Sequence, residues 1–323
     1  AEAAITSSKD GSITTVVYAF DALPDPYSTH TVTLSFSDSA GNSFSKDLSF
    51  SVNVDYKRLP ASFASTSVDK SSAGFIANVT QISTTQTDAA NNVHGNNTAN
   101  AEKQLAGLYL NPNDTDDDGN PLPYLNEADP DAWEGWSISP VDVDGTINWN
   151  QDEGAGIGNF GEDQAIPQIP GWGDSADGIV GEILGYLELS KGLHTLGVNS
   201  DDGFKLSFGP NPKDQLGIIA GEFNGGRGAA DTTFNVVAEA DGLYPVRLLW
   251  YEGGGGANVE FFSVVAGKKI LINDHDTADA IKAYRTADSA PYISRIVPAA
   301  GEMSRTIEID LSLIHISAPT RPR

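Results

Sequence analysis

The sequence predicts an all-β protein, an antiparallel β-sandwich or barrel with one or two short helices. Apolar residues alternate with polar ones in several segments, as where Phe204, Leu206 and Phe208 are separated by Lys205 and Ser207. The 33 Gly and 17 Pro residues punctuate the gaps between these segments. Many short strands joined by Gly- and Pro-rich turns are typical of sandwiches and barrels. A hydrophobic content of 39 % is enough to build a core.

The first part of the chain has the period-two pattern of a β-hairpin. Strands are predicted over Ser12–Phe20, His30–Asp38 and Ser43–Val54, with a turn at Ser39–Asn42 between the last two. The pattern resembles the final hairpin of an immunoglobulin-like bacterial repeat. Because such a sandwich usually takes about 100 residues, residues 1–56 are expected to form only part of one.

The next segments change in composition. Residues 57–73 are rich in Ser, Ala and Pro and are interpreted as a linker. Residues 74–83 read as a strand. Residues 96–110 predict a helix, because Asn and Thr residues suited to capping precede a run of good helix formers.

Strands return in the last third of the chain, over 243–251 and 258–265 among others. Residues 272–286 are expected to form a loop with a short helix. Residues 290–311 resemble the opening strand and turn of a second immunoglobulin-like domain. Residues 312–323 fit no core and resemble a translated sequencing-adapter tail, the alternative being a Pro-rich loop, and they are excluded from the fold prediction.

The charge of the chain excludes several classes of partner. The formal net charge is −25, so nucleic acid and anionic membrane surfaces would be repelled. No apolar run reaches the roughly 18 residues of a membrane span, so no membrane insertion is expected from this chain. The absence of Cys excludes disulfides, thiol nucleophiles and Cys-ligated zinc. An acidic, Cys-free, Gly/Asn/Asp-rich composition favours an extracellular or cell-surface bacterial location, where calcium is plentiful.

The distribution of charge is uneven as well. Between Gln104 and Ser190 there are 18 Asp and Glu residues and no Lys, Arg or His. Such a stretch is either a heavily solvated loop region or a region that meets cations.

Two segments carry a family resemblance. They are GYLELSKGLHTLGVNSDDGFKLSFG (185–209) and GLYPVRLLWYEGGGGANVEFFSV (242–264). A strand ending in Ser-Asp-Asp-Gly, then a Tyr-containing strand, a Gly-rich loop and another strand, resembles the protective-antigen fourteen-type (PA-fourteen) domain family. The resemblance implies a β-sandwich over about residues 74–287, of a kind found in bacterial toxins, glycosidases and yeast flocculins.

The pair Asp201-Asp202 is the central candidate site. Neighbouring carboxylates repel each other, and strands disfavour Asp, so a cation would relieve an unfavourable arrangement. In sugar-binding members of the family two such residues coordinate calcium, often across a cis peptide bond, and two vicinal hydroxyls of a glycan complete the ion's shell. Calcium accepts about 6–8 hard oxygen ligands in a flexible geometry. The alternative is that Asp201-Asp202-Gly203 is an ordinary surface turn.

The resemblance also supplies the remaining ligands. Asn258 matches the Asn-bearing second loop of sugar-binding relatives and is expected to bind the ion. The glycines before it, Gly255 and Gly256 among them, permit backbone carbonyls to approach it. Tyr251 alternates away from Trp250 and is the candidate for a ligand-binding rim, whereas Trp250 is expected to be internal. Glu252 is interpreted as a bystander.

A second acidic cluster lies earlier in the chain. Asp114, Asp116 and Asp118 fit the first ligand positions of a hand-type calcium loop, but Leu125 stands where that loop needs a bidentate Glu. The segment is therefore either a looser secondary metal site or a solvated turn. Four Trp residues lie in the base-free stretch: Trp133, Trp136, Trp149 and Trp172. Any of them that is exposed could stack on a sugar, although most aromatic residues pack in cores.

Nothing in the sequence indicates catalysis. There is no GxSxG or HExxH motif, and the five His residues are scattered. We therefore predict a calcium-dependent carbohydrate-binding or adhesion module, not an enzyme, that recognises glycans or polysaccharide on a large secreted or surface bacterial protein. Two alternatives stay open: a non-binding structural spacer stabilised by calcium, and an accessory domain of a secreted polysaccharide-degrading enzyme.

Overall fold

The computed structural model describes residues 4–11, 13–19, 24–38, 40–65, 68–83, 86, 95–129, 136–172, 175–285, 292–297 and 308–312. The chain divides into two compact units, Ala1–Tyr56 and Lys57–Arg323. No helix in these ranges is long and apolar enough to cross a membrane.

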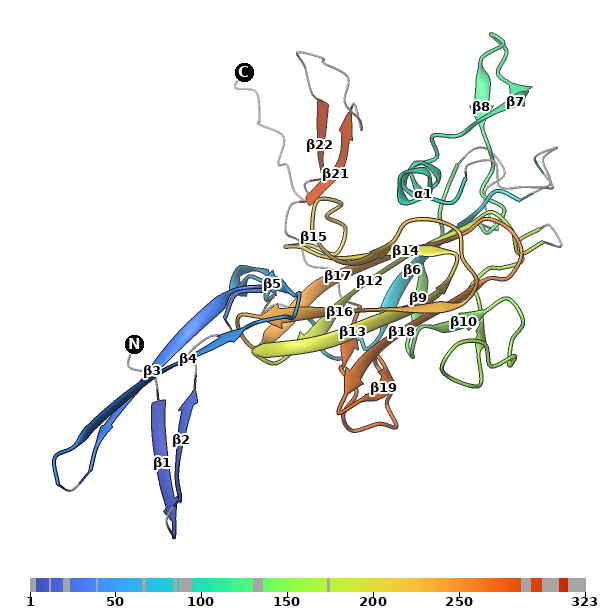
Figure 1. Ribbon diagram of the computed structural model, residues 1–323. Helices are drawn as coiled ribbons and strands as arrows, with labels where there is room; N and C mark the ends of the chain where they lie inside the picture. The colour runs from blue at the N-terminus through green and yellow to red at the C-terminus, as the bar shows by residue number, and fades with distance from the viewer. Residues whose placement is uncertain are drawn as a thin grey trace. The chain divides into compact units, whose positions relative to one another are not determined.

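The first unit contains two antiparallel hairpins (Figure 1). Strand β1 (Ala4–Asp10) pairs with β2 (Ile13–Ala19), and β3 (Thr29–Ser37) pairs with β4 (Ser43–Ser51). The predicted β3–β4 hairpin is confirmed, whereas β1 was not anticipated. The Asp38 carboxylate closes the turn by accepting the backbone N–H groups of Ala40 and Asn42 at 2.9 and 2.8 Å. This is the local bonding by which Asp favours turns.

The second unit is a β-sandwich of two seven-stranded sheets (Figure 1). The sheet named here the β18 sheet runs, in spatial order, through β11 (Gln164–Ala165), β10 (Asn148–Asn150), β18 (Asn258–Val265), β13 (Gly192–Asp201), β16 (Ala230–Ala238) and β5 (Lys57–Leu59), with β19 (Lys268–Leu271) also paired to β18. The β17 sheet runs through β15 (Ile218–Phe223), β14 (Gly203–Phe208), β17 (Gly242–Glu252), β12 (Ile179–Leu189), β6 (Phe75–Gln81) and β9 (Val141–Val143), with β20 (Ala283–Tyr284) paired to β12. The predicted all-β, mainly antiparallel fold is confirmed.

The core lies between the inner faces of the two sheets. In β17 the alternate residues Tyr244, Val246, Leu248 and Trp250 all belong to it. Trp250 is fully buried, as its phase in the alternation predicted. Period-two patterning therefore sorted the inward residues of this strand correctly.

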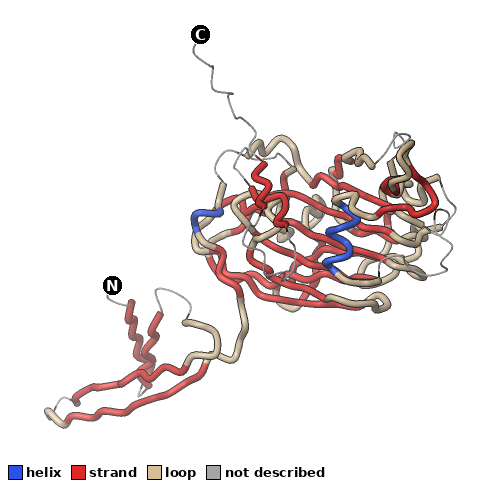
Figure 2. The backbone as a smooth tube through the Cα atoms, turned by 90° about the horizontal axis from the view of Figure 1, so that it is seen from above, coloured by secondary structure: helices blue, strands red, loops and turns tan. Residues whose placement is uncertain are grey.

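A helix covers part of the outer face of the β17 sheet. Helix α1 (Thr98–Leu105) begins after Asn97, whose side chain accepts the N–H of Asn100 as an N-cap. Figure 2 shows the helix lying across strands of the sandwich, and it contacts β12, β14 and β17. Its apolar residues pack on Val180 and Leu249 from the outward-facing alternation. The outer residues of β17 are thus buried as well as the inner ones.

A buried ion network fixes this helix to the sheet. The Arg247 guanidinium donates to both Glu102 oxygens at 2.6 and 2.8 Å and to Glu182 at 2.6 Å, while Lys205 donates to Glu102 at 2.8 Å. Burial alone would raise the pKa of Glu102, but the charges and hydrogen bonds of Arg247 and Lys205 hold it below its usual value. The network therefore keeps the Glu102 carboxylate ionised.

Some expectations need correction. Residues 57–59 are not linker, because β5 pairs in parallel with β16 and Leu59 is fully buried. Residues 272–285 contain no helix, but a series of turns leading into β20. Strands β21 (Tyr292–Val297) and β22 (Glu308–Ser312) pair antiparallel. Residues 313–323, most of the predicted non-native tail, lie outside the described residues.

Replacing Arg247 by Ala is expected to lower the free energy of unfolding by about 3–5 kcal/mol, because the partly buried Glu182 would lose its ion-pair partner and Glu102 would keep Lys205 alone. Lys70 forms an ion pair with Glu188, and the two side chains are 53 % and 38 % exposed. Replacing Lys70 should therefore lower the free energy of unfolding by at most about 1 kcal/mol. Urea unfolding of the two variants measures the difference. Equal losses would contradict a supporting role for the buried network.

Candidate functional site

The Asp201-Asp202 pair lies where the chain passes from one sheet to the other. Strand β13 of the β18 sheet ends at Asp201, and β14 of the β17 sheet begins at Gly203. The peptide bond between the two Asp residues is cis. Gly203 is required here, since a Cβ at this position would lie 2.1 Å from the Tyr251 hydroxyl. The pair is therefore built into a tight crossing and is not a free surface turn.

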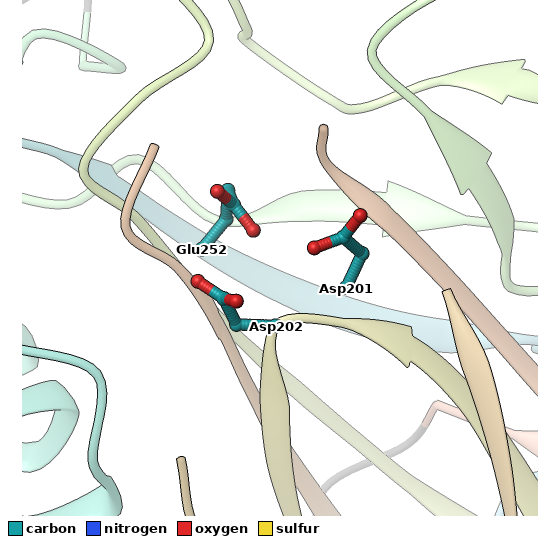
Figure 3. Close-up of side chains that lie close together, drawn as sticks. All are labelled: Asp201, Asp202 and Glu252. Carbon is teal, nitrogen blue, oxygen red and sulfur yellow. The ribbon is translucent and has the colours of Figure 1, made fainter. Parts of the chain in front are cut away.

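A third carboxylate joins the pair. Because β14 and β17 are antiparallel with Gly203 opposite Tyr251, Glu252 lies beside Asp202. One oxygen from each of Asp201, Asp202 and Glu252 lies within 4.8 Å of the others. Figure 3 shows the three carboxylates turned toward a common space. Glu252, interpreted as a bystander from the sequence, is thus part of the cluster.

Backbone and side-chain donors hold Asp202 in place. Its oxygens accept the backbone N–H groups of Arg227 at 2.8 Å and Gly253 at 3.0 Å, and the side-chain amide of Asn96. The Arg227 guanidinium donates to the Ser200 carbonyl at 3.1 Å and stacks over the Phe223 ring at 4.2 Å. The geometry of this carboxylate is therefore set by the protein alone.

Burial and mutual repulsion disfavour the charged forms of the other two acids. Burial, followed by the charge of Asp202, raises the pKa of Asp201 to about 6. Burial, followed by the charges of Asp202 and Asp201, raises the pKa of Glu252 to about 9. A cluster of three carboxylates in which Asp201 and Glu252 have such shifts gains from a cation.

Buried oxygens without donors show that the residues fit such a cation. Both carboxylate oxygens of Glu252 and the amide oxygen of Asn258 are buried and have no hydrogen-bond partner. Asn258 lies directly opposite Asp201 in the β13–β18 pairing. Its amide nitrogen donates to the Ile157 carbonyl at 3.4 Å, which turns the oxygen away from that loop. Unsatisfied buried acceptors are rare in native proteins, and a metal ion can satisfy them.

The glycine loop borders the same cluster. The Gly255 N–H donates to Asp177 at 3.2 Å, and a Cβ on Gly256 would lie 3.0 Å from an Asp201 oxygen. Residues 254–256 are exposed and Asp201 is partly exposed, so the loop borders the cluster on its solvent side.

Tyr251 does not occupy the rim expected from the sequence. It is only 3 % exposed and packs with Leu249 under helix α1. Its hydroxyl accepts the Gly225 N–H at 2.8 Å. The alternation correctly turned Tyr251 away from the core, but the helix covers that face.

The other predicted residues are dispersed. Among the described residues the only cluster of three or more acidic or His side chains able to share a metal is Asp201, Asp202 and Glu252, so Asp114, Asp116 and Asp118 do not converge. Asp116 instead caps a turn between β7 (Leu110–Thr115) and β8 (Pro121–Pro123), accepting the N–H groups of Asp118 and Asn120. This is the solvated-turn alternative.

The Trp residues divide by exposure. Trp149 is buried in the core, and Trp136 donates its indole N–H to the Leu105 carbonyl at 3.2 Å. Trp172 is 44 % exposed, and Trp133 lies outside the described residues. Trp172 is therefore the most exposed described member of this set.

Comparisons with known proteins show structural likeness only. No family model and no curated protein matches the chain. Solved structures with similar folds include a PA14 sugar-binding domain from an RTX adhesin (17 % identity, 62 % of this chain and 95 % of that one, TM-score 0.38) and the Epithelial Adhesin 6 A domain from Candida glabrata, solved with Galβ1-3GlcNAc (14 %, 70 % and 97 %, 0.41). The chain also matches 43 % of the length of an anti-sigma factor domain-containing protein, over 46 % of its own residues, at 16 % identity and a TM-score of 0.34. Likeness at this level assigns no family, so function has to follow from the site.

The raised pKa of Glu252 predicts that the stability of the metal-free protein depends on pH. A folded-state pKa of about 9 for Glu252, above its ordinary 4.5, contributes stability that is complete below pH 4.5 and is lost as the pH rises toward 9. In EDTA the melting temperature should therefore fall across this window more steeply for the wild type than for Glu252→Gln. Added calcium should remove the difference, because it favours the ionised form. Parallel pH profiles for the two proteins in EDTA would contradict the assignment.

Proposed function

We propose that this end of the sandwich binds calcium and, through it, a glycan. Asp201 and Asp202 are the anchoring ligands, with Asn258 contributing its amide oxygen and Glu252 a further carboxylate. The observation that carries the proposal is the convergence of three carboxylates whose neighbourhood leaves the Glu252 and Asn258 oxygens without donors.

The donor set favours calcium among common metals. All the candidate ligand atoms are oxygens, and the chain has no Cys. No His belongs to the cluster. Oxygen-only ligands from carboxylates, amides and backbone are what calcium prefers, whereas zinc and copper favour nitrogen and sulfur. The extracellular, cell-surface location predicted from composition would keep such a site loaded.

The open side of the cluster suits a carbohydrate. Bound calcium would supply open coordination positions for vicinal hydroxyls, as the resemblance to sugar-binding sandwiches implies. The exposed residues Gly254, Gly255 and Gly256 form the border of that side and leave room for a sugar ring. The chain's own task is to hold the carboxylates in position, which the donors from Arg227, Gly253 and Asn96 accomplish.

The surrounding architecture fits an adhesion module. We propose that residues 74–287, extended by β5, form the binding domain, and that the flanking hairpins belong to immunoglobulin-like repeats of a larger surface protein. The binding domain would then be presented to polysaccharide by its neighbours in the chain.

A structural role for calcium is the second candidate. The nearly complete burial of Asp202 and Glu252 favours it, because an ion held there would join β13, β14 and β17 whether or not a sugar binds. In that case calcium would rigidify a spacer. The two candidates differ in whether any glycan competes for the ion's coordination shell.

The calcium affinity of this cluster, resolved as its own step in isothermal titration calorimetry, should weaken by more than about 100-fold in Asp201→Asn/Asp202→Asn, since even outer-shell changes at metal sites cost 10–100-fold. Asp116→Asn, an exposed turn residue, is the matched control and should bind as the wild type does. Unchanged affinity in the double variant would refute the site.

A glycan array, probed with and without EDTA, tests the sugar. The proposal predicts binding that EDTA abolishes and that the double variant lacks. Glycan binding that persists in EDTA would contradict recognition through the ion. No glycan binding, together with calcium-dependent melting, would favour the spacer.

A further inference from the structure

A second set of oxygen-bearing side chains crosses the outer face of the β18 sheet. Neighbouring strands place Asn148 beside Glu260, and Glu260 beside Asn199. Asp163 adjoins Asn148, because β10 and β11 are parallel with Trp149 opposite Gln164. Trp149, Phe261 and Val198 point into the core, so the alternation puts Asn148, Glu260 and Asn199 on the opposite, outer face.

The chain segment 154–160 closes over this row. The backbone N–H groups of Asn159 and Phe160 donate to Glu260 at 2.7 and 3.0 Å, and the N–H of Ile157 donates to Asp163 at 2.8 Å. Gly158 lies so close that a Cβ there would approach a Glu260 oxygen to 2.5 Å. Under this cover Asp163, Asn148, Asn199 and Glu260 are at most 4 % exposed.

Three oxygens in the row have no donor. They are Asp163 Oδ1, Asn148 Oδ1 and Asn199 Oδ1. The amide orientations are fixed, since Asn148 donates its nitrogen to the Gly161 carbonyl at 3.1 Å and Asn199 donates to the Asp231 carboxylate at 2.8 Å. Carbonyls and carboxylates only accept hydrogen bonds, so each amide oxygen points away from the partner of its own nitrogen.

The charge of the row favours a cation over a water molecule as the species that satisfies these oxygens. Asp163 and Glu260 bring two carboxylates, and within the described part of the chain neither forms an ion pair; the nearby Lys269 is paired with Asp231 instead. A water molecule donates only two hydrogen bonds and carries no charge, whereas a divalent cation matches both the acceptors and the charge.

We infer that the row is a second calcium site, in which Asp163 and Asn148 contribute their unpartnered oxygens beside the Glu260 carboxylate. The ion would fasten segment 154–160 to the β18 sheet. The same segment accepts the Asn258 amide at Ile157, so the second ion also steadies a ligand of the first site. The inference does not depend on glycan binding.

Equilibrium dialysis with ⁴⁵Ca²⁺ counts the ions. The wild type should bind two per chain, and Asp201→Asn/Asp202→Asn should bind one. Adding Asp163→Asn to that double variant should remove it, whereas adding Asp152→Asn, the same change at an exposed position of the same loop, should not. A double variant that binds no calcium, or a remaining ion that survives Asp163→Asn, would overturn the inference.

Proteolysis checks the site without altering it. Glu153 and Glu162 are exposed within this loop and are cleavage points for a Glu-specific protease. In the Asp201→Asn/Asp202→Asn protein, which retains the second site intact, calcium should slow cleavage at both positions at least tenfold. Equal cleavage rates in calcium and in EDTA would count against the ion, even if Asp163→Asn fails to fold.

Discussion

The structure depends on the way three carboxylates are held at the crossing between the two sheets. Asp201, Asp202 and Glu252 approach one another because β13, β14 and β17 meet there, and Gly203 allows the chain to pass close to Tyr251. Their repulsion and burial oppose folding unless protons or a cation neutralise them. Asp202 is fully hydrogen-bonded by the protein, whereas Glu252 is not, so the cluster is incomplete on one side only.

A chain segment covers part of the outer face of each sheet, and in both places it contacts a buried charged side chain of that sheet. Over the β17 sheet, helix α1 brings Glu102 to Arg247, so a side chain supplies the cation. Over the β18 sheet, segment 154–160 brings backbone donors to Glu260, and within the described part of the chain no side-chain cation pairs with this carboxylate. The sequence explains the contrast, since the stretch from Gln104 to Ser190 holds 18 acids and no base. Where the chain lacks its own cations, solvent ions are the available substitute.

The sequence predicted the parts of this picture that are local. Alternation identified β14, β17 and β18 and placed Trp250 inside, and the Asp-Asp-Gly motif marked the crossing. Glu252 was missed because its place beside Asp202 follows from strand register, which no single segment reveals. Tyr251 was placed on the correct face, but its burial depends on a helix about 150 residues earlier. The three-residue strand β5 was read as linker because it is too short to show a period.

The central claim, that a divalent cation neutralises the carboxylates at the crossing, is tested most directly by anomalous X-ray diffraction from crystals grown with calcium at neutral pH. The account predicts an anomalous difference peak within about 2.3–2.6 Å of oxygens from Asp201 and Asp202. No peak there, with Glu252 instead sharing a proton with Asp202 in a short hydrogen bond, would contradict it.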